Sequence, residues 1–197
     1  MKVVILAKEV PDTWGSRRLD EVTGWLDRAS SEPVLDEINE RTIEHLLKYR
    51  DNGGDVEIVA LTMAPASSET SIRKLLAMGA DSAVVVADEQ LKGSDAVRTA
   101  QVLAAAIKKI APDLVFAGKE STDGRGGIVP AMISEYLDWP VFVALDELQI
   151  NDDSVSGSAA VDGEVLTLKS TFPAVVVITE RSAEARFPNF KGIMQAK

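Results

Sequence analysis

The chain contains no cysteine, and its only histidine is His45. Without cysteine there are no disulfides, no thiolate metal ligands and no thiol nucleophiles. One histidine does not supply a histidine-based zinc site, and no Ser–His–Asp arrangement is formed around it. We place His45 beside Glu44 on the solvated side of a helix. Carboxylate sites for harder cations stay open, but we expect neither a metal site nor catalytic residues.

Positive charge is scarce as well, with 21 Lys and Arg against 31 Asp and Glu and a net charge of −10. Nucleic acids and anionic membranes need clustered positive charge, so we expect neither as a partner. Any phosphate must be held locally, by backbone N–H groups and one or two basic side chains.

Long apolar runs are also missing. Residues 1–8 are too short an apolar run for a signal peptide. No stretch approaches the roughly 18 apolar residues of a membrane span. We therefore expect a soluble cytoplasmic protein without membrane insertion.

What is present is an ordinary globular composition: 197 residues, 46% hydrophobic and 26% charged, which indicates a single domain. Apolar, β-branched runs predict strands buried on both faces. We expect these strands at 3–7, 56–61, 82–87, 113–117, 141–145 and 173–178.

Helical patterns lie between these strands. The expected caps are Asp36, Ser67 or Ser68, and Ser94, and a fourth helix spans 128–137. The alternation predicts an α/β fold, a Rossmann-like parallel sheet with helices on both faces. Residues 148–168 predict a small antiparallel ribbon near the C-terminus. The polar segment 8–33 suggests a short hairpin around 19–26, and 179–197 reads as an irregular tail.

The glycine-rich stretch 118–127, GKESTDGRGG, is the strongest candidate for a binding site. It follows a buried strand and precedes a helix, so its N–H groups can face an anion with the helix dipole behind them. Arg125 can bind a phosphate through its guanidinium fork, and Ser121 and Thr122 can donate hydroxyls. An ordinary strand-to-helix turn also explains these residues. The stretch is neither GxxxxGK[ST] nor GxGxxG.

Several segments together resemble the β subunit of electron transfer flavoproteins. The matching segments are VILAKEVPD at 4–12, DEINERTIEHLLKYR at 36–50, IRKLLAMGAD at 72–81, DLVFAGKESTDGRGG at 113–127, LDWP at 137–140 and FPAVVVITERSAEARFPNFKGIMQAK at 172–197. Their order and spacing match over essentially the whole chain.

The resemblance implies an adenine-nucleotide-binding subunit of a heterodimer. The α subunit of this family carries most contacts to a redox-active FAD, and the β subunit holds AMP or, in electron-bifurcating members, a second FAD. Electrons enter from flavin dehydrogenases and leave to a downstream acceptor. The β subunit is then an electron carrier subunit without bond chemistry of its own, and not an enzyme.

By position, the resemblance implies a nucleotide site at the ends of the first, second and fourth strands. Its residues would be Leu6, Asp36, Glu37, Ile38, Asn39, Met63, Gly118, Lys119, Ser121, Thr122, Asp123, Gly124, Arg125, Gly126, Gly127, Ile128 and Val129. The family loop usually carries an acidic run and a glutamine where this chain has Gly124, Arg125 and Ile128. Fewer carboxylates favour anion binding, but the choice between AMP and FAD stays open.

The resemblance also implies that residues 179–197 form a partner-docking tail. Phe190 occupies the position of the family's exposed apolar anchor, flanked by Arg186, Phe187 and Lys191. We expect Phe187, in contrast, to pack back on the sheet. Family members continue beyond the position of Lys197 with an arm that embraces the α subunit. That arm is absent from this sequence, which is either a fragment or the sequence of a subunit that holds its partner differently.

Two other functions are compatible with the predicted fold. A free-standing nucleotide-binding protein resembling universal stress proteins would bind ATP or AMP without flavin, but it leaves the tail without a role. An ATP-pyrophosphatase-type enzyme needs a Ser-Gly-Gly phosphate loop after the first strand, where this chain has residues 8–12, KEVPD.

Overall fold

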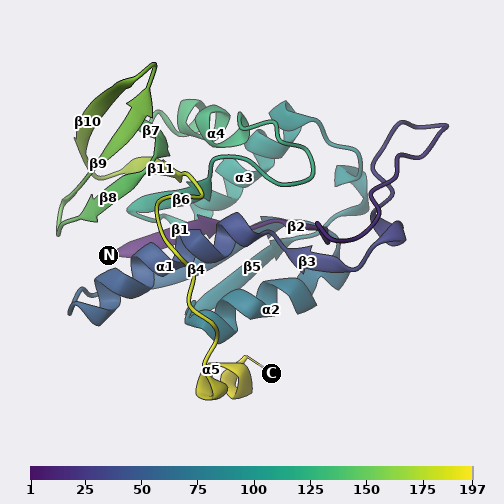
Figure 1. Cartoon of the computed structure of the whole chain (residues 1–197), viewed down its shortest axis with the longest axis horizontal. Coiled ribbons are helices and arrows are strands. Elements are labelled where there is room, and N and C mark those ends of the chain that lie inside the picture. The colour runs from purple at the N-terminus through teal and green to yellow at the C-terminus, as the bar shows by residue number, and fades with distance from the viewer. Residues whose placement is uncertain (197) are drawn as a thin grey trace.

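The computed structural model describes residues 1–196, and its centre is a sheet of six parallel strands in the order β5-β4-β1-β6-β11-β7 (Figure 1). All six predicted central strands are confirmed, within two residues at each end. They are β1 (Lys2–Leu6), β4 (Glu57–Met63), β5 (Ser82–Val86), β6 (Leu114–Gly118), β7 (Val141–Leu145) and β11 (Ala174–Ile178).

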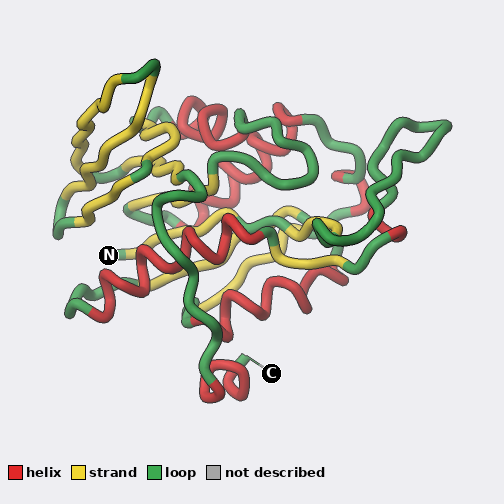
Figure 2. Tube along the Cα trace, in the orientation of Figure 1, coloured by secondary structure: helices red, strands yellow, loops and turns green. Residues whose placement is uncertain are grey.

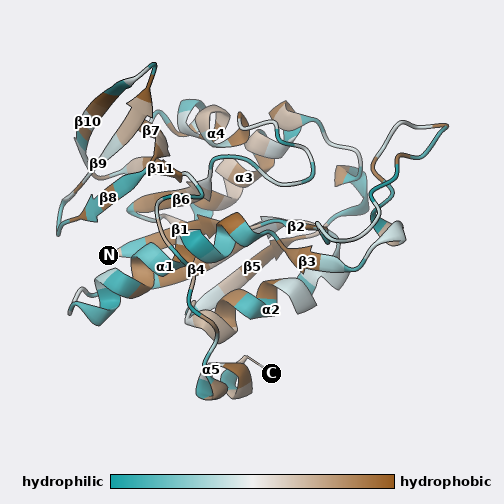
Figure 3. Ribbon diagram, viewed as in Figure 1, coloured by the Kyte–Doolittle hydropathy of each residue, from teal (hydrophilic) through white to brown (hydrophobic). Residues whose placement is uncertain are grey.

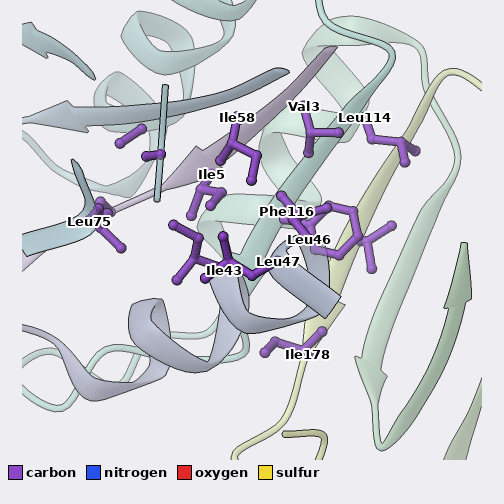
Figure 4. Packing of buried hydrophobic residues seen from close by; sticks show 14 of the residues in the cluster. Val3, Ile5, Ile43, Leu46, Leu47, Ile58, Leu75, Leu114, Phe116 and Ile178 are labelled. Atoms are coloured by element: carbon purple, nitrogen blue, oxygen red, sulfur yellow. The ribbon is translucent and has the colours of Figure 1, made fainter. Parts of the chain in front are cut away.

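Helices cover both faces of this sheet, as the alternating pattern predicts. One face packs against α1 (Glu37–Asp51) and α2 (Glu69–Met78), and the other against α3 (Ala96–Ile110) and α4 (Val129–Leu137). On the first face, Ile43 and Leu46 of α1 lie over Ile5 and Phe116 of the sheet, all of them fully buried (Figure 4). The apolar colouring is concentrated on the central strands in Figure 3.

Two helices begin differently from the prediction. Asp36 caps α1 as expected, but α3 is capped by Asp95, whose Oδ1 accepts from the backbone N of Arg98 at 2.8 Å. Ser94, the predicted cap, instead donates its hydroxyl to the Leu91 carbonyl. Ser68 stands at the start of α2 but makes no capping hydrogen bond. Asp and Ser cap helices about equally well, but the negative charge of a carboxylate also interacts favourably with the helix dipole, which favours Asp95 at the start of α3.

The predicted antiparallel ribbon is confirmed as a sheet of three strands in the order β10-β9-β8. Its strands are β8 (Glu147–Ile150), β9 (Ser154–Val161) and β10 (Glu164–Thr171). Asp162 and Gly163 form the turn between the two longer strands with positive φ at both residues. The sheet attaches to the core through the buried side chains of Val155 and Ala159.

The segment after β1 contains a strand pair that the sequence did not suggest. β2 (Glu9–Pro11) and β3 (Pro33–Leu35) pair antiparallel. They enclose residues 12–32, here called the strap, which project from the molecule (Figure 1). The predicted hairpin is confirmed within it by an antiparallel bridge between Leu19 and Leu26.

Short helices complete the chain. They are the 3-10 helices η1 (Arg28–Ser30), η2 (Ala66–Ser68) and η3 (Glu89–Leu91), and α5 (Phe190–Gln195) in the tail. The tail runs irregularly from β11 as predicted, but it then folds into α5 beside α2 (Figure 2). Lys197, the last residue of the predicted tail, lies outside the described residues. In residues 1–196, no helix is both long and apolar enough to cross a membrane.

Candidate functional site

The candidate site lies where the order of the parallel strands reverses. From β1 the chain moves outward to β4 and β5, and then returns to place β6 on the other side of β1. The chain leaves β1 toward β4 on one side and leaves β6 toward β7 on the other, so the two connections separate at the carboxyl ends of β1 and β6. Ligands of open α/β sheets bind at such points. Leu6 ends β1, Met63 ends β4 and Gly118 ends β6. Residues far apart in the sequence therefore meet at one sheet edge.

Two predicted site residues, Asp36 and Asn39, are buried and connect the elements at this edge. The Asn39 amide accepts from the backbone N of Lys8 at 2.9 Å and donates to the carbonyl of Leu6 at 3.1 Å. Asp36 Oδ2 accepts from the backbone N of Thr122 at 2.7 Å and from its hydroxyl at 3.1 Å. These bonds fasten the glycine-rich loop to β1 and to the start of α1.

Asp123 is the centre of an ion group in the loop, and its carboxylate is 1% exposed. Lys8 Nζ lies 2.7 Å from Oδ1, and Arg28 Nη2 lies 2.7 Å from Oδ2. Burial raises the pKa of Asp123, but the hydrogen bonds and charges of these cations and of Ser121 outweigh it. The net effect holds that pKa well below its usual range. Asp123 is therefore ionised, and the two positive charges of Lys8 and Arg28 exceed its single negative charge.

The strap holds the loop at a second point. The Arg17 guanidinium donates to the carbonyl oxygen and to the hydroxyl of Thr122, and also to the carbonyl of Pro11 at 2.8 Å. Arg28, which contacts Asp123, belongs to the strap as well. The loop is thus held by the strap on one side and by α1 on the other.

The remainder of the loop forms an exposed rim. Arg125 donates from Nε and Nη2 to Glu120 Oε1, at 2.9 and 2.7 Å, so that this pair has no net charge. Gly127 has φ of +62°, which turns the chain into α4, and no side chain caps that helix. The first turn of α4 therefore leaves backbone N–H groups without a side-chain partner beside the loop, although Pro130 in that turn has no N–H.

The other predicted residues lie around this rim. Ile38 packs against Gly118, and the exposed Lys119 donates its backbone N to the carbonyl of Ile178. Glu37 and Ile128 are exposed, and Val129 is half-buried. The structure therefore brings the predicted set to one place.

A cleft of about 500 Å³ adjoins the loop at Thr122, between α1, the strap and the tail. Carboxylates outnumber cations in its lining, which does not favour a phosphate. The carboxylates belong to Asp12, Asp36, Glu37, Glu40 and Glu184, and the cations are Arg41 and Lys74. Among the described residues, no three Asp, Glu or His side chains are grouped so that they could hold a metal ion.

Comparison with known proteins places this geometry in a family. A family model described as "Electron transfer flavoprotein domain" matches residues 23–197. A protein of Mycobacterium tuberculosis (strain ATCC 25618 / H37Rv) named "Electron transfer flavoprotein subunit beta" is 44% identical over 200 residues, covering 99% of this chain and 75% of the relative. The chain belongs to the electron transfer flavoprotein β subunit family.

Other β-subunit relatives are more distant. The protein of that name from Thermoanaerobacterium thermosaccharolyticum is 30% identical and is matched over all of this chain and 75% of the relative. "Caffeyl-CoA reductase-Etf complex subunit CarD" of Acetobacterium woodii is 29% identical with the same coverage. The family consists of flavoproteins that transfer electrons.

The tail of this β-subunit family member differs from our expectation at Phe187. That side chain is 93% exposed, so the prediction that it packs on the sheet is wrong. Arg186 explains the difference, because its guanidinium binds the buried Glu44 carboxylate at 2.7 and 2.9 Å and holds the tail over α1. The two phenylalanines, Phe190 being 80% exposed, are left in solvent. Lys191 is exposed beside them.

His45 also differs from its predicted solvated position. It is half-buried, and its Nε2 lies 3.1 Å from Ser182 Oγ. Burial, assisted by the charge of Lys48 and opposed by that of Glu44, lowers the pKa of His45 to about 4. The imidazole is therefore neutral at neutral pH.

Sequence reasoning missed Lys8, Arg17 and Arg28 as residues of this site. Lys8 follows a buried strand directly, which is a signal that could have identified it. Arg17 and Arg28 lie in a polar segment with no periodicity, about a hundred positions before the loop that they contact. Nothing local in the sequence indicates that contact.

Proposed function

We propose that this chain is the β subunit of an electron transfer flavoprotein heterodimer and binds an adenine nucleotide, AMP or FAD, at the β1/β6 edge. In this function it is an electron carrier subunit without bond chemistry of its own. FAD held together with an α subunit passes electrons from flavin dehydrogenases to a downstream acceptor, and the tail docks the dehydrogenases. The glycine-rich loop at the strand-order reversal, joined to an uncapped helix start, is the observation that carries the nucleotide assignment.

The names of relatives support the assembly into complexes. CarD is named as part of a caffeyl-CoA reductase-Etf complex, and a protein of Anaerotignum propionicum, 29% identical, is named "Acryloyl-CoA reductase electron transfer subunit gamma". The exposed Phe187 and Phe190 support docking, because exposed aromatic side chains are frequent binding hot spots.

Purification of the native complex tests this function. We expect an α-type partner to co-purify, with flavin absorbance, and mass spectrometry of the released small molecules to find FAD together with AMP, or FAD alone at two per heterodimer. A colourless native protein without a partner and without an adenine nucleotide would contradict the proposal. ATP or AMP bound to a flavin-free homodimer would favour the free-standing nucleotide-binding protein.

A further inference from the structure

Two groups of charged side chains lie at the glycine-rich loop, and they differ in net charge. Arg125 is paired with Glu120, so one cation meets one carboxylate on an exposed surface. The group of Lys8, Arg28 and Asp123 places two cations around one carboxylate. This second group keeps one net positive charge in a chain whose total charge is −10.

The cations of this group also have hydrogen-bond donors to spare. Lys8 Nζ has three N–H donors, and its two contacts are Asp123 Oδ1 at 2.7 Å and Ser121 Oγ at 3.1 Å. Arg28 uses Nη2 for Asp123 and makes a 3.5 Å contact from Nη1 to the carbonyl of Glu9. The Lys8 and Arg28 side chains are 45% and 53% exposed. A further anion can therefore reach both of them from solvent.

A glycine faces Lys8, so no side chain from that position covers its ammonium group. A Cβ atom on Gly124 would lie 3.9 Å from Lys8 Nζ and 3.9 Å from Ser121 Oγ. A Cβ atom on Gly126 would have no neighbour within 4 Å. In the adjoining cleft, in contrast, carboxylates outnumber cations. Charge and free donors thus coincide at Lys8.

We propose that the phosphate of the nucleotide binds to the Lys8 ammonium, with Arg28 as the second charge and Asp123 holding both cations in place. This assignment rests on the proposed nucleotide function and identifies the side chain that binds the phosphate of the nucleotide. Arg125 then has a minor role, because an anion would have to displace Glu120 from its guanidinium. The buried carboxylate is an orienting group, since its two oxygens bind one cation each.

A comparison of AMP with adenosine tests the assignment, because the two ligands differ by the phosphate. Calorimetric titration of the purified protein freed of bound ligand should show that Lys8→Met weakens AMP binding about 10- to 100-fold. Adenosine binding should change less than about threefold, because it lacks the group that Lys8 contacts. Arg28→Gln, a change at a half-exposed side chain, should weaken AMP selectively by a smaller factor.

A matched control and the competing assignment lie close by. Arg18→Gln removes an exposed arginine of the strap and should leave AMP affinity unchanged. Arg125→Ala tests the competing assignment: it leaves Glu120 unpaired, but because the Arg125 side chain is 75% exposed, AMP affinity should fall by less than about threefold. A large loss for Arg125→Ala together with no selective loss for Lys8→Met and Arg28→Gln would overturn the assignment to Lys8.

Asp123→Asn separates ligand binding from loop support by the ratio of AMP affinity to adenosine affinity. If Lys8 and Arg28 bind the phosphate, loss of the carboxylate that orients them weakens AMP binding more than adenosine binding. If the group only shapes the loop, both ligands weaken in parallel, and the assignment is wrong. Wild-type protein that binds neither AMP nor FAD would instead contradict the proposed nucleotide function itself.

Discussion

At the scale of single residues, His45 shows how a distant contact changes the chemistry of a side chain. Ser182 donates its hydroxyl to the carbonyl of Thr179 at 2.8 Å, so its oxygen is left to accept from His45 Nε2. Sequence pattern places His45 on a polar helix face, but the tail after β11 covers that face. Only the tertiary structure brings residues 45 and 182 together.

This burial makes the stability of the protein dependent on pH. The pKa of His45 is about 4 in the folded protein, whereas that of an unperturbed histidine is 6.5. As pH falls from 6.5 to 4, the unfolded chain takes up a proton that the folded protein does not bind, so folding is progressively disfavoured. We expect His45→Gln to reduce the loss of unfolding free energy over this interval by about 2–3 kcal/mol.

Urea unfolding at pH 7, 5.5 and 4.5 measures this difference. Carboxylates such as Asp123 contribute their own acid destabilisation in both proteins, so the comparison between wild type and variant isolates the histidine. Equal pH dependence in the two proteins would show that His45 titrates normally.

Phe190 permits a residue-scale test of docking. Its side chain is 80% exposed, so Phe190→Ala removes little folded-state packing and should leave the melting temperature nearly unchanged. Truncation of a hot-spot aromatic costs roughly 2 kcal/mol or more, so electron transfer from a cognate dehydrogenase should slow at least tenfold at low protein concentration. Val165→Ala, at another exposed apolar side chain, is the control. An unchanged rate for Phe190→Ala would argue that the anchor lies elsewhere.

At the scale of elements, α5 packs against α2 at a glycine. A Cβ atom on Gly192 would overlap the carbonyl oxygen of Ala77, so the backbones of the two helices touch there. Arg73 of α2 adds a hydrogen bond to the carbonyl of Ala196 at 2.8 Å, and Asn189 caps the start of α5. This contact sets the position of the exposed Phe190.

We expect Gly192→Ala to displace α5 from α2. Overpacking of a close contact costs typically 1–3 kcal/mol, although part of this cost is avoided when the short helix detaches. Electron transfer with the dehydrogenase should fall, while the nucleotide site at the carboxyl ends of β1 and β6 keeps its affinity for AMP. Gln195→Ala, at an exposed position of the same helix, should show neither effect, and equal behaviour of the two variants would exclude a positioning role for Gly192.

Elements with an unbroken apolar run or a helical period could be predicted from the sequence, and three others could not. The inner strands of the central sheet, β4, β1, β6 and β11, are buried on both faces, so their β-branched runs are unbroken, whereas the edge strands β5 and β7 are partly exposed. β2 and β3 have three residues each, and α5 has six. Strands of three residues and a helix of six are too short to show an apolar period, and their formation depends on tertiary contacts.

At the scale of the whole molecule, the parallel sheet concentrates binding groups at one edge. It brings Lys8, Arg28 and Asp123 together although they are spread over more than half of the chain. The loop itself could be predicted, since it follows a buried strand and is rich in glycine. The cations opposite it could not, because their position depends on the path of the strap.

Nucleotide binding should stabilise the entire domain. A ligand at a hundred times its dissociation constant stabilises the folded state by about 2.7 kcal/mol, which for a domain of this size raises the melting temperature by roughly 5–10 °C. Differential scanning calorimetry with increasing AMP, and with adenosine and inorganic phosphate as controls, measures the shift. A melting temperature independent of AMP up to millimolar concentrations would show that no such site forms in the isolated protein.

The strap contains tryptophans whose fluorescence can be measured. Of the three tryptophans, Trp14 and Trp25 lie in the strap, and Trp139 follows α4. Trp14 is 93% exposed, and the Trp25 ring lies against Gly93. Because Arg17 and Arg28 connect the strap to the glycine-rich loop, we expect a ligand that shifts the loop to alter the contact of Trp25 with Gly93, while Trp14 stays in water. Emission from Trp25 is therefore expected to follow binding at the sheet edge in real time without an attached dye.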